Sequence, residues 1–434
     1  MEDRFSETPI ENVLKESYGV FKHCAHTLYC VELFRMIHPS KRLSLPEFVT
    51  LLAMMTSIMA LSIDAILPAL GEISRELQLA NDNDAQLVVS SMFLGFAVGQ
   101  IIAGPLADSF GRKPIIYLGY VIFILGCLMS LFSSSFAVML LGRVLQGLGA
   151  AAPRIVGIAL VRDCYEGRAM ARIMSIVMAI FILVPAIAPA IGQGIMLIAS
   201  WRAIFVLLLV MAIIAFIWFI FRQPETLPKE ARRPFSFEKI LMGIREIAGY
   251  RAVTGYTLAA GVIFGAFLGY LSSAQQVFQT TYDTGQWFAV YFGGAALSIG
   301  AASVFNSYFV MQLGMRYLTW WSLSILTAIS CIFLGVDFVF GGVPPLWSFM
   351  VWLLAAFFCI GILFGNFNAL AMEPIGHMAG LGAAVIGSVS TFISLPLGWA
   401  IGASFNGTAT PLVLGFTVLG ATSLVIVRWT ERRL

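Results

Sequence analysis

Long apolar stretches alternate with short polar segments along almost the whole chain. Each stretch has about the 20 apolar residues that a helix needs to cross a bilayer, and twelve of them follow one another. The pattern therefore predicts twelve membrane-spanning helices. The predicted spans are Phe48–Ala69, Leu87–Ala107, Ile115–Ser133, Phe136–Leu160, Ile173–Ile198, Ile204–Phe221, Thr254–Ala274, Trp287–Val310, Leu318–Val336, Trp347–Ala371, Leu381–Ser404 and Pro411–Val427.

One polar connector, from Arg222 to Arg251, is much longer than the others and divides the spans into two blocks of six. Two equal blocks joined in this way are typical of transporters that are built from repeats and bind substrate near the midplane. The alternative is a twelve-helix protein without internal symmetry. The predicted fold is thus an all-α integral membrane protein of twelve transmembrane helices in two six-helix pseudo-repeats. The predicted domains are a tail at 1–46, a first bundle at 47–221, a linker at 222–251, a second bundle at 252–428 and a C-terminus at 429–434.

The composition fits a chain that is solvated mostly by lipid. Hydrophobic residues make up 59% of the 434 residues and charged residues only 11%, whereas soluble proteins carry about 25% charged residues. The net charge of +3 is small and by itself indicates no nucleic-acid partner. The six cysteines are scattered without a paired framework, so no disulfides are expected.

The basic residues gather in the connections on one side of the predicted bundle. If the N-terminus is inside, the outer connections hold only Arg75 and Arg202. Because Lys and Arg are enriched on the cytoplasmic side, both termini are predicted to be cytoplasmic. The basic residues of the inner connections are Arg112, Lys113, Arg162, Arg168, Arg172, those of the connector from Arg222 to Arg251, Arg316, Arg428, Arg432 and Arg433.

Two charged residues inside the predicted spans are costly there and are therefore candidates for function. Asp64 in the first span is the only carboxylate clearly within an apolar stretch, and Arg143 in the fourth span lies at a similar depth in the outer half. Burial disfavours a charged carboxylate, whereas a nearby guanidinium favours it, so a carboxyl group under both influences can exchange a proton near neutral pH. We predict proton coupling by Asp64 and Arg143. The alternatives are a fixed ion pair between them, or an Asp64 that faces the outer water.

Other polar residues also lie within the spans. Arg154 follows Pro153 about three turns deeper than Arg143, where its side chain can snorkel towards the cytoplasm or line an inner cavity. Amide side chains in a span either join helices by hydrogen bonds or contact substrate, and both roles stay open here. The residues assigned to the predicted substrate cavity are Asp64, Gln100, Gln146, Gln193, Asn366 and Asn368; Asn306 is a further intramembrane amide.

The segment Gly104-Pro105-Leu106-Ala107-Asp108-Ser109-Phe110-Gly111-Arg112-Lys113 joins the second and third spans. Gly104 can let helices approach closely, Gly111 can make a tight turn, and Asp108 and Arg112 can pair. The segment resembles the signature loop of the major facilitator superfamily, except that Ser109 replaces a basic residue. The resemblance implies a cytoplasmic latch that stabilises the outward-facing state. Its residues are Gly104, Asp108, Gly111, Arg112 and Lys113, together with Asp163; the corresponding loop of the second half, 311–316, keeps only traces of the pattern.

Two further segments resemble motifs of proton-coupled members of that superfamily. The segment Leu141–Ala151 is similar to the fourth-span motif whose arginine, here Arg143, is placed in proton transfer. The segment Val184–Gly194 is similar to the fifth-span antiporter motif, although Ala188 and Gln193 stand where glycines are common. Helix kinks are predicted in this segment, at Pro185, Pro189 and Gly192.

Three more stretches resemble the bicyclomycin and chloramphenicol resistance (Bcr/CflA) branch of drug–proton antiporters: Ser62–Leu70, Val161–Tyr165 and Gly365–His377. The resemblance covers Glu47 to about Arg428. It implies a monomeric transporter in the inner membrane of a bacterium. Such a protein exports small, mostly apolar or cationic compounds in exchange for protons by alternating access, and it has no cofactor and no nucleic-acid partner.

Two alternatives are open from the sequence. The same fold can carry a dedicated metabolite, such as a sugar or an amino acid, together with protons. An intramembrane enzyme or a receptor is a remote alternative, because the spans contain no Ser/His or paired-carboxylate arrangement and no clustered metal ligands. In the tail, which can form an amphipathic helix on the membrane surface, the residues His23, Cys24, His26 and Cys30 fit no standard zinc pattern, so no metal site is predicted.

Overall fold

The computed structural model describes residues 43–232 and 235–432, so most of the predicted tail, including its His and Cys residues, lies outside the described residues. Within them, 12 helices are long and apolar enough to cross a membrane, and there is no strand. All twelve predicted spans are confirmed. The helices are α2 Leu45–Asp64, α4 Leu87–Phe110, α5 Arg112–Leu131, α6 Phe136–Cys164, α7 Gly167–Met196, α8 Arg202–Arg222, α10 Arg251–Gln275, α11 Phe288–Leu313, α12 Met315–Val339, α13 Leu346–Met372, α14 Ala379–Ala403 and α15 Thr410–Glu431.

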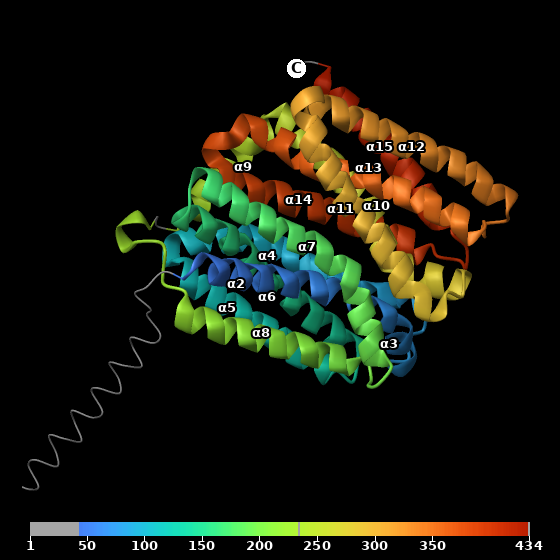
Figure 1. Cartoon of the computed structure of the whole chain (residues 1–434), viewed down its shortest axis with the longest axis horizontal. Helices are drawn as coiled ribbons and strands as arrows, with labels where there is room; N and C mark the ends of the chain where they lie inside the picture. Colours follow the sequence, from blue (N-terminus) through green and yellow to red (C-terminus); the bar gives the residue numbers. More distant parts are fainter. Residues whose placement is uncertain (1–42, 233–234, 433–434) are drawn as a thin grey trace, which may run out of the picture.

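The helices form two groups that lie side by side (Figure 1). We call α2–α8 the first half and α10–α15 the second half. In the first half α4 and α5 both pack against α6, and in the second half α14 and α15 both pack against α10. The halves meet along two helix pairs, α4 with α14 and α7 with α11.

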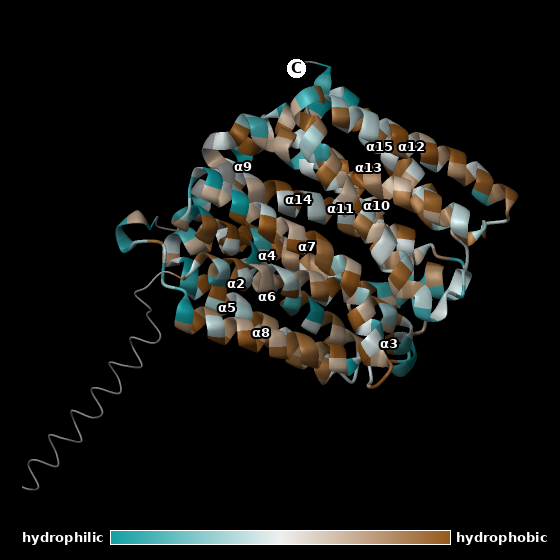
Figure 2. Cartoon of the chain, viewed as in Figure 1, coloured by the Kyte–Doolittle hydropathy of each residue, from teal (hydrophilic) through white to brown (hydrophobic). Residues whose placement is uncertain are grey.

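The outer helices present apolar side chains to their surroundings. Figure 2 shows hydrophobic residues along almost the whole length of α8, and several of them, such as Ile214 and Ile217, are about half exposed. An exposed apolar surface of this extent is stable only in contact with lipid. The chain is therefore a multi-pass membrane protein.

The first span is interrupted near one end. The helix α2 ends at Asp64, a 3₁₀ turn covers Leu67–Ala69, and the chain continues as the short helix α3, Leu70–Glu76. Pro68 explains the break, because a proline lacks the backbone N–H and clashes with the carbonyl group four residues earlier. At the same end of the second half, α10 passes into a π-helical turn, Gln276–Thr281.

The long connector is not entirely irregular. It contains a 3₁₀ turn at Lys229–Ala231 and the helix α9, Phe237–Gly249, which packs against α10 and α14. The sequence pattern predicts only a polar linker in this region, and the helix α9 is seen only in the structure.

The two ends of the bundle differ, and each is named here after one of its residues. The Arg112 end contains the α4–α5 junction, the end of α6 and the connector. The Gln86 end contains α3, the 3₁₀ turn Asp82–Gln86, the π-helical turn of α10 and the end of α14.

Candidate functional site

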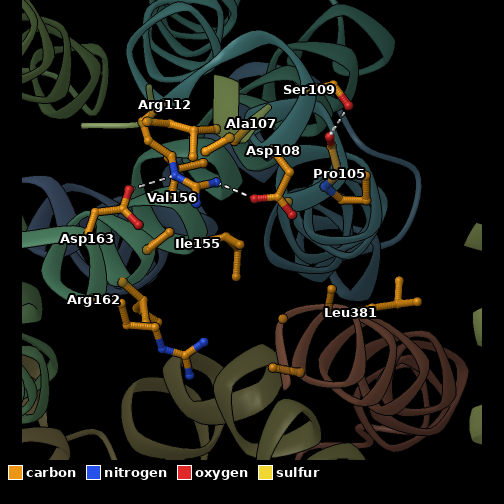
Figure 3. A pocket seen from close by; sticks show the side chains of 18 of the residues that line it. Pro105, Ala107, Asp108, Ser109, Arg112, Ile155, Val156, Arg162, Asp163 and Leu381 are labelled. Carbon is orange, nitrogen blue, oxygen red and sulfur yellow. Dashed lines mark hydrogen bonds and ion pairs between the residues drawn. The ribbon is translucent and has the colours of Figure 1, made fainter. Parts of the chain in front are cut away.

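A cavity of about 560 Å³ opens at the Arg112 end. Its wall comes from α4, the start of α5, α6, the connector and α14, so both halves contribute to it. Figure 3 shows Arg112, Asp108 and Asp163 on one side of the cavity and Leu381 of α14 on the opposite side. The wall is mostly apolar, with charged groups concentrated near the α4–α5 junction. Such a surface suits a small molecule with a large apolar part.

The cavity exists because α4 and α14 touch along only part of their length. Towards the Gln86 end they are in contact, since the Ser388 hydroxyl donates to the carbonyl oxygen of Ala97 at 2.8 Å. The cavity wall begins further along, at Gly104 on α4 and Ala384 on α14. Gly104 therefore does not bring helices together in this conformation, contrary to the expectation from sequence: nothing lies within 4 Å of the position that its Cβ would take.

Arg112 is the centre of a charged network at this end. Its guanidinium donates to Asp108, one turn earlier, and its Nε donates to Asp163 Oδ2 at the end of α6 at 3.0 Å. The Arg112 side chain is only 10% exposed. Gly111 makes the sharp junction between α4 and α5 possible, because its φ of +105° is a conformation that side chains with a Cβ rarely adopt. The network joins α4, α5 and α6, all in the first half.

The connector adds a carboxylate that the sequence analysis missed. Glu225 accepts the backbone N–H groups of Arg112 and Lys113 at 3.0 and 3.1 Å, so it binds the N-terminus of α5. Unpaired N–H groups and the helix dipole make such an end a binding site for an anion. The Thr226 hydroxyl also donates to Asp163 at 2.8 Å. No local pattern indicates this contact, because Glu225 is more than 110 residues away from its partners.

The second half has a reduced counterpart of this network. Arg316, at the start of α12, pairs with Glu373, just after α13, at 3.4 Å. Their side chains are 50% and 54% exposed. The traces of the motif in residues 311–316 therefore accompany one exposed ion pair rather than a buried network.

Asp64 lies at the other end of the first span, where α2 breaks. It is only 4% exposed. The 3₁₀ turn that follows it packs against α10 of the second half. Within the described residues, Asp64 makes no side-chain hydrogen bond and no salt bridge. A buried carboxyl group without a counter-charge is costly when ionised.

Arg143 is completely buried and binds neutral oxygen atoms. Its Nε donates to the carbonyl oxygen of Val88 at 3.0 Å, its Nη1 to Gln146 Oε1 at 2.6 Å, and its Nη2 to the carbonyl oxygen of Ser62 at 2.9 Å. The expected pairing with Asp64 is thus not formed in this conformation. The physical reason is local, since the last carbonyl groups of a helix lack intrahelical partners and the break in α2 leaves that of Ser62 available.

The other amide residues assigned to the cavity do not line it here. Gln146 also donates to the Ser130 hydroxyl at 3.2 Å, and Asn366 exchanges two amide hydrogen bonds with Asn306. These contacts join helices within one half. Of the remaining amides, Gln100 is buried against Gly387, Gln193 of α7 donates to the Gly285 carbonyl oxygen, and Asn368 is exposed.

The helix α7 runs through Pro185 and Pro189 as one continuous helix. Its Gly192 packs on the break in the first span, because a Cβ there would lie 1.9 Å from the carbonyl oxygen of Ala65. Only glycine permits this approach. The segment therefore supports the region around Asp64.

The Gln86 end is closed by neutral amide side chains that reach across the halves. Gln86 Nε2 donates to Gln276 Oε1 at 2.6 Å and to the Gly402 carbonyl oxygen at 2.9 Å. Gln276 in turn donates to Asn83 at 2.8 Å, and Asn83 donates to carbonyl oxygens at the end of α14. We call Asn83, Gln86 and Gln276 the amide clasp.

Comparison with known proteins gives the family. The profile described as Major Facilitator Superfamily matches residues 52–403. A transporter of this superfamily from Bacillus subtilis, YdgK, is 28% identical over 88% of this chain and 95% of its own length. The bicyclomycin resistance protein homolog of Haemophilus influenzae is 29% identical over 88% of this chain and 94% of its own. Multidrug resistance protein D of Escherichia coli is 26% identical over 74% of this chain and 80% of its own.

Solved structures agree with the fold. The xylose transporter XylE from E. coli, in a partially occluded inward open conformation, superposes with a TM-score of 0.68 over 89% of this chain and 97% of its own. The human organic anion transporter MFSD10 gives a TM-score of 0.65 over 89% and 99%. Their identities to this chain are 12% and 15%, so these likenesses concern the fold alone.

Proposed function

Because the chain belongs to the major facilitator superfamily, and is thus a transporter of small molecules rather than an enzyme, we propose that it exports small, mostly apolar or cationic compounds in exchange for protons. The names of two relatives, a bicyclomycin resistance protein homolog and a multidrug resistance protein, support export of drugs. The largely apolar cavity supports the same class of cargo.

The proposal places the chain in the inner membrane of a bacterium, as a monomer, with the Arg112 end in the cytoplasm. The bias of Lys and Arg towards the connections of that end supports this orientation. The conformation is then inward-facing, since the cavity opens at the Arg112 end and the amide clasp closes the other. Cargo enters the cavity from the cytoplasm, and rocking of the halves opens the Gln86 end to release it.

Asp64 carries the proton in this proposal, and its position is the observation on which the coupling rests. It is buried at the break of the first span, where the 3₁₀ turn packs against α10 of the opposite half. When the clasp opens, Asp64 gains access to the outer water, and its protonation there favours release of the cargo. Loss of the proton to the cytoplasm resets the site.

In this proposal Arg143 holds in place the segment of α2 that carries Asp64. Its bond to the Ser62 carbonyl oxygen holds the end of α2 two residues before Asp64. The three neutral acceptors around Arg143 leave its positive charge uncompensated by any salt bridge among the described residues. That charge favours the ionised form of Asp64 when the two groups approach each other during the cycle.

The test is transport of lipophilic cations into inside-out vesicles, driven by a proton gradient. Asp64→Asn should abolish gradient-driven accumulation, because the amide cannot carry a proton. Asp337→Asn is the matched control. Asp337 is the other buried carboxyl group in the described spans, which the sequence pattern does not indicate, and it accepts a hydrogen bond from Thr410 within the second half. Undiminished transport by Asp64→Asn contradicts the coupling role.

A compound panel tests the cargo. Addition of a transported compound to wild-type proteoliposomes should release protons for several unrelated apolar or cationic compounds. A response to one sugar or one amino acid alone identifies a dedicated metabolite transporter instead.

A further inference from the structure

Arg154 is a charged residue within a span that the proposed cycle does not use. It precedes the end of α6 at Cys164 by 10 residues, or about 15 Å at 1.5 Å per residue. The whole helix has 29 residues, or about 43 Å at the same rise, so its polar ends extend beyond a hydrocarbon core of about 30 Å. Arg154 therefore lies in the half of the span nearer the Arg112 end, where a charged group is still costly and is a candidate for function.

The surroundings of Arg154 form a small cavity of about 20 Å³ between α2, α6 and α7. Thr56 and Leu52 contribute from α2, and Met174, Met178 and Phe181 from α7. The wall also includes Ile158, which lines the large cavity as well, so the two cavities are neighbours. The small cavity has room for about one water-sized group.

Arg154 has no counter-charge in this environment. Among the described residues it makes no salt bridge and no side-chain hydrogen bond, whereas Arg112 and Arg143 each bind two or three oxygen atoms. Its one specific partner in the part of the chain that the structure describes is Phe181, whose ring centre lies 4.0 Å from the guanidinium carbon. The ring face attracts the cation but accepts none of its five N–H donors.

We propose that Arg154 and Phe181 form a subsite for a carboxylate group borne by an aromatic compound. The guanidinium matches a carboxylate in geometry and charge, and Phe181 holds the guanidinium plane in place. The carboxylate group enters the small cavity, which the flexible side chains of Met174 and Met178 can enlarge. The aromatic part of the ligand lies in the neighbouring large cavity, against Ile158, which lines both. The inference rests on the proposed function and adds aromatic carboxylates to its cargo.

Binding to the purified chain in phosphatidylcholine nanodiscs tests the subsite. The probes are 1-naphthoate and 1-naphthamide, which have nearly the same shape and differ in charge. We expect the wild type to bind the acid about tenfold more tightly than the amide, and Arg154→Gln to remove this difference. Arg154→Lys should keep part of it. Arg172→Gln, an exposed change of the same type on α7, should have no effect.

Three results overturn the inference: equal affinities of the wild type for the two probes, an equal loss of both in Arg154→Gln, or competition of naphthoate with phosphatidylglycerol added to the nanodiscs, which assigns Arg154 to a lipid phosphate. The wild-type comparison stands even if a variant does not fold. Phe181→Leu keeps the charge and removes the ring face, and it should weaken binding of the acid more than of the amide. The assay needs no proton gradient, so failure of the transport test and failure of this one are distinguishable.

Discussion

The two ends of the bundle are held by different chemistry. At the Arg112 end, a guanidinium binds two carboxylates and Glu225 binds a helix terminus, all within the first half and its connector. At the Gln86 end, the amide clasp crosses between the halves with neutral groups only. The other ion pairs of the described residues, Arg202–Glu76 and Arg222–Glu47 in the first half and Arg316–Glu373 in the second, also stay within one half.

This division suits a protein whose halves must separate and rejoin. A hydrogen bond between neutral groups contributes about 1 kcal/mol net, so a few of them close an end without trapping it. A buried ion pair is costly to break, about 3–5 kcal/mol when one partner is lost. Charged contacts therefore stiffen each half, and neutral contacts act where the halves part. The Arg112 network is already assembled while its end is open.

The largest effect should come from Arg112→Gln. The change leaves Asp163, with a side chain only 18% exposed, without its guanidinium. We expect a loss of about 2–3 kcal/mol in unfolding free energy, measured by denaturant titration in mixed micelles, together with impaired transport. Arg162→Gln, which removes an exposed charge from the same cavity wall, serves as control. An unchanged unfolding free energy contradicts the conclusion that the charged Arg112 network stabilises the first half.

Gln86→Leu should have an intermediate effect, on conformation rather than on stability. The change removes two hydrogen bonds across the halves, so the population open at the Gln86 end should rise about tenfold. Spin labels at Ala80 and Trp287, one on each half, report this change as a longer distance. Ser404→Ala, which loses only a bond within α14, should leave the distance distribution unchanged.

The dependence of the same spin-label distance on salt concentration is a second test of the amide clasp. Because the clasp is neutral, raising the ionic strength should leave its open population unchanged. A strong dependence on salt shows that charges outside the clasp hold this end.

The smallest effect should come from Arg316→Gln, the second-half counterpart of Arg112→Gln. Both partners are about half exposed, and such ion pairs contribute about 0–1 kcal/mol. We expect a change of less than about 0.5 kcal/mol in the same titration. A loss as large as that of Arg112→Gln means that the halves are more alike than the structure indicates.

Local sequence patterns predict many residues of the candidate site, but they predict only some of the contacts between those residues. The α4–α5 motif places Asp108 and Arg112 one turn apart, so their pairing is predictable. The bond from Arg143 to the carbonyl oxygen of Ser62 is not predictable, because it depends on where α2 ends and which carbonyl oxygen is thereby left free. The sequence does not indicate that Asp337 lies inside the bundle, because the residue follows directly after an apolar stretch. In the structure it is buried.

The sequence by itself determines the twelve spans. Lipid demands about 20 apolar residues per helix, and this requirement acts locally along the chain, whereas the break of the first span near Pro68 is seen only in the structure. Which end is open, which amides face each other across the halves, and that Glu225 binds the start of α5 are decided by the tertiary structure alone. These contacts join residues more than 100 positions apart, and they depend on how two rigid bundles lean against each other.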